Sequence, residues 1–185
     1  AAKDSRGNDL LAALSRKDDD YVQTYGHKLR QGLAEEHFLE LDLGKLPEFE
    51  HLHLYLTGWL YPTDTSINVA ISRDPRLSPP RPPAIQVPDA EGNWQTVVPF
   101  CGFPGGKTKT VVYDLSKVFL TEDYRVRVVS NMELYWDAVW FTVNEPGGGL
   151  EMQELPLREA RLRYRGFSAP VTHSRNGPER YEYAA

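Results

Sequence analysis

The stretch that decides the fold runs from Tyr124 to Val143 and reads YRVRVVSNMELYWDAVWFTV. It opens with alternating arginine and valine, and its second half carries large apolar or aromatic side chains at both parities. Period-two alternation of β-branched and aromatic residues predicts two β-strands. We expect a turn at Ser130-Asn131, since Asn tolerates left-handed backbone angles. The second strand is expected to be central and covered on both faces.

Three side chains of this second strand carry specific expectations. Trp136 and Trp140 share one parity and are predicted to lie in the core, whereas Asp137 faces the other side. A carboxylate on a central strand is costly unless it is paired. A hairpin would bring Arg125 and Arg127 close to it. We therefore expect Asp137 to pair with an arginine or to accept loop N–H groups, and so to hold the strand register.

Working outward from this stretch, the same alternation predicts further short strands. They are expected at residues 36–43, 51–59, 66–72, 84–87, 93–98 and 110–115. Many short strands separated by turn signals are typical of an all-β sandwich. The long loops at 75–83 and 100–107 favour a jelly roll over a simple meander.

The chain divides into three predicted parts. Residues 36–149 form the β-sandwich domain, residues 1–35 an N-terminal arm with a short helix, and residues 150–185 a C-terminal arm and tail. The last segment has too many apolar side chains for a free linker, and they are too irregular for a core strand pair. We expect it to bind outside its own sandwich.

Composition excludes several classes of protein. Lys and Arg number 21 against 26 Asp and Glu, and the net charge of −5 argues against a nucleic-acid binder. No apolar run approaches the roughly 20 residues that cross a bilayer. The single Cys101 excludes an internal disulfide and a Cys-rich zinc site. No motif of a catalytic constellation is present, so the chain is predicted not to be an enzyme.

An aromatic pair suggests a carbohydrate site. Trp59 and Tyr61 lie at the end of a predicted strand, before a Pro-Thr-Asp turn where a sugar ring could stack. Asp64 and Asn68 follow closely and complete the candidate set. The alternative is that both rings pack in the core, as most large aromatic side chains do.

A glycine-rich loop, GFPGGKTKT at residues 102–110, is a candidate anion site. Backbone N–H groups around Gly105 and Gly106 could form a nest, with Lys107 and Lys109 adding positive charge. A P-loop needs one more residue of spacing and a following helix, whereas the next residues read as a strand. A tight crossover loop is the alternative.

No cofactor is expected, with a structural calcium ion as the alternative. Hard cations take six to eight oxygen ligands, often from loops. The candidate ligands are Asp64, Asp74, Asp89, Asp114 and Asp137. They show no EF-hand spacing, and turn aspartates commonly accept hydrogen bonds from their own backbone.

Two family resemblances follow from longer motifs. LELDLG (39–44), IQVPDAEGNWQTV (85–97) and YWDAVWF (135–141) resemble a galactose-binding-like jelly roll. GWLYPTDTSINVAI (58–71), GFPGGKTKT (102–110), NMELYWD (131–137) and LRYRGFS (162–168) resemble a C-terminal region of bacterial FG-GAP/ASPIC-UnbV proteins, some of which contain TPR repeats. This second resemblance implies an exported, multidomain protein, periplasmic or extracellular, and a non-catalytic accessory domain.

These observations together predict a non-enzymatic β-sandwich interaction domain that acts as a scaffold or structural subunit in a larger assembly. Its partners are expected to be other protein subunits, contacted through the N- and C-terminal arms. The alternative is a carbohydrate-binding module that recognises glycans through Trp59, Tyr61, Asp64 and Asn68.

Overall fold

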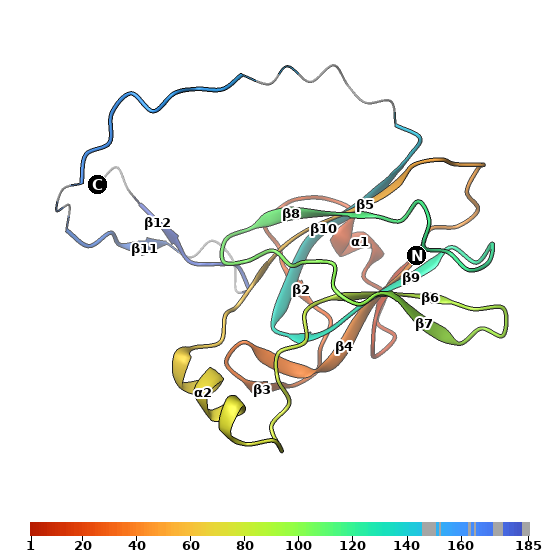
Figure 1. Cartoon of the computed structure of the whole chain (residues 1–185), viewed down its shortest axis with the longest axis horizontal. Helices are drawn as coiled ribbons and strands as arrows, with labels where there is room; N and C mark the ends of the chain where they lie inside the picture. The colour runs from red at the N-terminus through yellow and green to blue at the C-terminus, as the bar shows by residue number, and fades with distance from the viewer. Residues whose placement is uncertain (146–150, 152, 163, 165, 172–175, 183–185) are drawn as a thin grey trace.

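Two antiparallel sheets form the body of the fold and pack face to face (Figure 1). The computed structural model describes residues 1–145, 151, 153–162, 164, 166–171 and 176–182. Sheet A has the order β1-β4-β9-β6-β7, with β3 added to β4, and sheet B has the order β2-β10-β5-β8. The strands of sheet A are β1 (Ala2–Asp4), β3 (Lys28–Arg30), β4 (Leu33–Asp42), β6 (Ala84–Pro88), β7 (Trp94–Val98) and β9 (Arg125–Met132). Those of sheet B are β2 (Val22–Gln23), β5 (Leu52–Leu60), β8 (Lys109–Asp114) and β10 (Leu134–Val143).

The chain passes repeatedly from one sheet to the other, at β4–β5, β7–β8, β8–β9 and β9–β10. Together with the packing of the two sheets, this confirms the predicted all-β sandwich. Strand alternation turns every second side chain into the space between the sheets. The inward set is apolar and fully buried, and its largest members are Leu39, Leu52, Leu54, Leu56, Ile85, Leu115, Leu134 and Trp136.

The predicted hairpin within residues 124–143 is wrong in its pairing, although both strands exist. β9 belongs to sheet A and β10 to sheet B, and the chain crosses between the sheets at Glu133. Ser130 and Asn131 lie inside β9 rather than in a turn. Their side chains hold the proline-rich segment instead, since Asn131 Nδ2 donates to the Pro79 carbonyl at 2.9 Å. Local alternation specifies a strand, but it does not specify which strand lies beside it.

A β-bulge in β10 changes which side chains face the core. The register with β5 shifts between Trp136 and Ala138, so Asp137 is the extra residue. Trp136 is 1% exposed, as predicted. Trp140 is 41% exposed and stacks on Tyr55, so the prediction that it lies in the core is wrong. The inserted residue moves every later side chain of β10 to the opposite face from the one predicted.

Asp137 is buried but does not pair with an arginine. Its Oδ1 accepts hydrogen bonds from the backbone N–H groups of Asp18 (3.0 Å) and Asp19 (3.1 Å). The second of the two predicted arrangements, in which loop N–H groups donate to this carboxylate, is therefore the correct one. Because β9 lies in the other sheet, Arg125 and Arg127 are not the neighbours of Asp137; they pair with Asp123 and Glu40.

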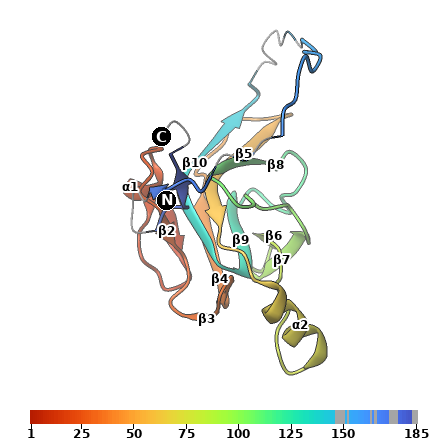
Figure 2. The same cartoon turned by 90° about the vertical axis from the view of Figure 1, so that its left-hand side faces the viewer.

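A helix stands where a strand was predicted at residues 66–72. α2 (Thr65–Arg73) is capped by Asp64, whose side chain accepts the N–H of Ile67 at 2.8 Å. α2 buries none of its side chains and lies at one end of the sandwich (Figure 2). With no neighbouring strand to pair with, the local capping interaction decides the conformation.

The two ends of the chain differ from the arms that were expected. β1 pairs with β4, and Leu14 of the short helix α1 (Leu11–Leu14) is buried, so the first residues belong to the sandwich. Residues 153–162 arch away from the sandwich, and their side chains are exposed (Figure 1). The chain then returns, and β11 (Pro170–Val171) pairs with β12 (Arg180–Tyr181). Among the described residues, no helix is long and apolar enough to cross a membrane.

Candidate functional site

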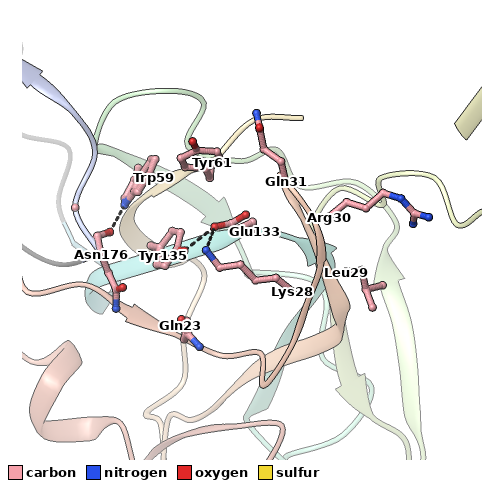
Figure 3. Close-up of a pocket in the computed structure, with 11 residues that line it drawn as sticks. Gln23, Lys28, Leu29, Arg30, Gln31, Trp59, Tyr61, Glu133, Tyr135 and Asn176 are labelled. Atoms are coloured by element: carbon pink, nitrogen blue, oxygen red, sulfur yellow. Dashed lines mark hydrogen bonds and ion pairs between the residues drawn. The ribbon is translucent and has the colours of Figure 1, made fainter. Parts of the chain in front are cut away.

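A cavity of about 690 Å³ opens on the outer face of sheet B (Figure 3). The register of β2, β10 and β5 places Gln23, Tyr135 and Trp59 in one row across the strands. This row faces away from the core, because the next residue of β10, Trp136, faces into it. The side walls come from β3 and the residues after it, and from Asn176 and Gly177 near the end of the chain.

Aromatic rings form the floor of this cavity. The rings of Trp59 and Tyr135 stack at 5.1 Å with an angle of 13° between their planes. Tyr25 packs edge-on against Tyr135 at 6.0 Å, and Tyr61 packs edge-on against Trp59 at 5.7 Å. Trp59 is 7% exposed, whereas Tyr61 is 41% exposed. Tyr61 therefore presents the ring surface that a ligand can reach most easily.

A buried carboxylate, Glu133, organises the polar wall. It accepts hydrogen bonds from Lys28 Nζ, from the Tyr135 hydroxyl at 2.6 Å and from the Gly32 backbone N–H at 3.0 Å. The Lys28 side chain reaches to Glu133 and Tyr135, whereas the Arg30 side chain extends away from them (Figure 3). Glu133 is thus held by three donors, two from β3 and the turn after it and one from β10.

Burial and the neighbouring Glu133 both shift the pKa values of Lys28 and Tyr135. Burial lowers the pKa of Lys28, but its hydrogen bonds to Glu133 and Tyr135 outweigh burial and leave that pKa above its usual range. Burial raises the pKa of Tyr135, and the hydrogen bond to Glu133 raises it further. At neutral pH the cavity therefore holds an ammonium group beside a phenol that keeps its proton.

The close approach of two loops sets the position of Lys28. Gly32 has φ +76°, and a Cβ atom there would lie 2.3 Å from the backbone nitrogen of Thr63. Only glycine allows the β3–β4 turn to lie this close to the segment after β5. Gln31 Nε2 donates to the Pro62 carbonyl at 3.1 Å and joins the same two segments.

The end of the chain covers one side of the cavity. We call residues 176–181 the C-terminal strap. The indole N–H of Trp59 donates to the Asn176 carbonyl at 2.8 Å, and Asn176 Nδ2 donates to the Tyr21 carbonyl at 3.2 Å. Arg180 pairs with Asp19 at 2.6 Å. The expectation that residues 150–185 bind outside their own sandwich is therefore wrong for the strap, which docks on sheet B.

Two of the four predicted carbohydrate-binding residues line the cavity. Trp59 and Tyr61 lie in its wall, and Asp64 and Asn68 do not. Asp64 caps α2, and hydrogen bonds from Ser66 and Ile67 lower the pKa of Asp64. Asn68 Oδ1 accepts a hydrogen bond from the Thr63 hydroxyl at 2.9 Å. These two polar side chains thus stabilise the local turn and helix.

Sequence reasoning missed most of the polar wall. The missed residues come from distant segments and are Gln23, Lys28, Gln31, Glu133, Tyr135 and Asn176. One signal was available, because Glu133 stands between the apolar Met132 and Leu134 in an otherwise buried stretch. A lone carboxylate in such a stretch indicates a specific set of donors around it.

The glycine-rich loop forms a crossover between β7 and β8. Gly105 makes an isolated parallel bridge with Leu60, and Gly106 has φ +74°. Lys109 is the first residue of β8 and lies opposite Gly58. A strand follows the loop where a P-loop would have a helix. Lys107 lines a second cavity of about 320 Å³, whose other wall is the strap.

The candidate calcium ligands lie apart from one another and accept hydrogen bonds from nearby groups. Asp74 accepts from Arg76, Asp89 from the backbone of its own hairpin turn, and Asp114 from Ser116. Within the part of the chain that the structure describes, no three His, Cys, Asp or Glu side chains converge in a way that could hold a metal ion.

Cys101, the one thiol in the sequence, is poorly suited to nucleophilic chemistry. Its Sγ donates to the Pro83 carbonyl at 3.0 Å, and burial raises its pKa to about 11. The nucleophilic thiolate is therefore scarce at neutral pH.

Comparisons with known proteins do not assign this chain to a family. A scan against models of protein families finds no match for this chain, and a search of curated proteins finds none either. The resemblances to galactose-binding-like domains and to the C-terminal regions of FG-GAP/ASPIC-UnbV proteins therefore stay predictions.

Proposed function

We propose that this domain is a non-catalytic binding module that holds a carbohydrate in the cavity on sheet B. The observation that supports this most strongly is the meeting of a half-exposed aromatic ring with charged and amide side chains in one preformed cavity. Its volume of about 690 Å³ falls within the range of small-molecule sites.

The chemistry of a sugar fits these two kinds of surface. A pyranose has an apolar C–H face and a rim of hydroxyl groups that both donate and accept hydrogen bonds. Tyr61 offers a ring for the apolar face, and Lys28 and Gln23 offer polar groups for the rim. The rigid floor of Trp59 and Tyr135 lowers the entropy cost of binding, because these rings are already packed.

The arrangement of Glu133 favours binding over catalysis. Acid–base chemistry on a glycosidic bond generally uses two carboxylates that flank the bond. Glu133 already accepts from three donors, and its side chain is 2% exposed. We infer that this carboxylate positions Lys28 and Tyr135 and does not transfer protons to a substrate.

A glycan array followed by calorimetric titration tests the proposal. Tyr61→Ala should weaken binding of the selected oligosaccharide about tenfold, since it removes a stacking ring. The matched control is Trp140→Ala, because Trp140 has the same 41% exposure but does not line the cavity. Equal losses in both variants, or an absence of saturable binding to any glycan, would contradict the proposal.

A second candidate function is an interaction domain in an exported assembly. It is supported by exposed apolar side chains in the segment between β10 and the strap: Leu155, Leu157, Leu162, Tyr164 and Phe167. Water-exposed apolar side chains in such number are typical of a surface that a partner covers. Export itself rests on the resemblance to FG-GAP/ASPIC-UnbV proteins. Size-exclusion chromatography with candidate partner subunits tests this function, and a Leu157→Ser/Leu162→Ser variant should lose the complex.

A further inference from the structure

We propose that the C-terminal strap is a displaceable cover, which competes with the carbohydrate for the cavity on sheet B. This inference rests on the proposed function, because it concerns access to the same cavity. It assigns to residues 176–181 a regulatory contact within the chain.

The first support is the hydrogen bond that Trp59 makes. Its indole N–H is a donor at the cavity wall, and the Asn176 carbonyl oxygen accepts it at 2.8 Å. A sugar hydroxyl oxygen is an acceptor of the same kind. The strap therefore places its own oxygen where a ligand oxygen would bind, and Trp59 is left only 7% exposed.

The second support is the solvent exposure of the ion pair that holds the strap. Arg180 pairs with Asp19, but the two side chains are 41% and 39% exposed. Ion pairs exposed to this degree contribute little to stability. Asn176 Nδ2 adds a hydrogen bond to the Tyr21 carbonyl, at 3.2 Å and near the upper end of the usual range. Pro178 of the strap is buried.

The third support is the chain that connects the strap to β10. β10 ends at Val143, and residues 153–162 are exposed and pack on neither sheet. Release of the strap therefore leaves the core cluster between the sheets unchanged. The strap and the cavity belong to one chain, so the contact forms without a partner chain and does not depend on protein concentration.

Competition of this kind has a measurable consequence. The apparent affinity for a ligand falls in proportion to the fraction of molecules whose site is open. A variant that weakens the strap should therefore bind the carbohydrate more tightly than the wild-type chain. This direction is opposite to the one expected if the strap were simply a wall of the site.

The experiment uses the full chain with Arg180→Asp and the charge-swapped pair Asp19→Arg/Arg180→Asp. Arg180→Asp sets two carboxylates against each other, and we expect binding of the array-selected oligosaccharide to become about three- to tenfold tighter. The swapped pair restores an ion pair and should return the affinity to the wild-type value. In ¹H–¹⁵N spectra, the Trp59 indole resonance, assigned through Trp59→Phe, should shift in Arg180→Asp without ligand.

The outcomes separate this inference from the proposed function. If the wild-type chain binds and Arg180→Asp binds equally or more weakly, the strap is not a competitor and the inference fails, while the carbohydrate site stands. If neither the wild-type chain nor Arg180→Asp binds any glycan, the proposed function fails and the inference fails with it.

Discussion

Two buried clusters lie on opposite faces of sheet B, and they are built in different ways. The core cluster between the sheets contains Trp136 and consists of apolar side chains from strands of both sheets. The outer cluster consists of Tyr21, Tyr25, Ala34, Trp59 and Tyr135. Trp136 and Tyr135 are neighbours on β10, and both are less than 5% exposed. Burial by itself therefore does not distinguish the core from the candidate site.

The difference lies in what covers each cluster. Sheet A covers the core cluster with apolar side chains, whereas loops, the strap and the polar group around Glu133 cover the outer cluster. Apolar packing on the inner face contributes stability through area removed from water. The polar side chains on the outer face line the cavity, where a ligand can reach them. Substitutions on the two faces should therefore separate stability from binding.

The largest expected loss of stability comes from a substitution on the inner face of sheet B. Trp136→Ala should lower the free energy of unfolding by about 3–5 kcal/mol, because it removes a fully buried aromatic side chain and leaves a cavity. Urea denaturation measures this change. Trp140→Ala on the same strand is the control and should cost no more than about 1.5 kcal/mol, since Trp140 is half-exposed and mainly loses its stacking on Tyr55. Similar losses in the two variants would show that the bulge does not separate their environments.

A smaller effect is expected on the outer face. Glu133→Ala leaves the Tyr135 hydroxyl and the Gly32 N–H without their acceptor, and should cost about 1–3 kcal/mol. It should also abolish carbohydrate binding, because Lys28 loses its position. Glu133→Gln keeps an acceptor for these donors and should be less destabilising in the same urea experiment. Full retention of binding by Glu133→Ala would show that the polar wall does not contribute to the site.

The smallest effect concerns Asp137, which lies between the two clusters at the bulge. Burial raises the pKa of Asp137, although the N–H groups of Asp18 and Asp19 lower it. A carboxyl group with a raised folded-state pKa adds stability below its unfolded pKa of about 3.9, and this contribution is lost as the pH rises through the folded pKa. The loss of stability in Asp137→Asn, measured against the wild-type chain, should therefore be largest near pH 3 and smaller toward pH 7. Thermal midpoints measured across this range check the sign, and parallel pH profiles for the two proteins would contradict it.

Part of the fold could be predicted because it depends on neighbours in the sequence. Alternation along β4, β5 and the first part of β10 predicts strands and the side chains that face the core, and the structure agrees for Leu39, Leu54 and Trp136. Where one residue is added, as at Asp137, the same rule gives the wrong face for Trp140. Where the local signals compete, as at Asp64 and Ser66, a capped helix replaces the predicted strand.

The candidate site could be predicted only in part from the sequence, for a related reason. Trp59 and Tyr61 are close in sequence and indicated a binding surface, and both line the cavity. Lys28 and Glu133 are separated by 105 positions, and Asn176 lies 117 positions from Trp59. Their meeting depends on the order of strands in the sheets and on the return of the chain end, and neither leaves a periodic pattern in the sequence.

The sequence by itself therefore determined an all-β sandwich, its longer strands and much of its core, because strand formation and burial follow from a two-residue period. Only the tertiary structure decided that β9 and β10 lie in different sheets and that Glu133 lies where the chain crosses between them. It also decided that the strap packs against Trp59. These features depend on packing between residues far apart in the chain. Such packing selects among many arrangements that are locally equivalent.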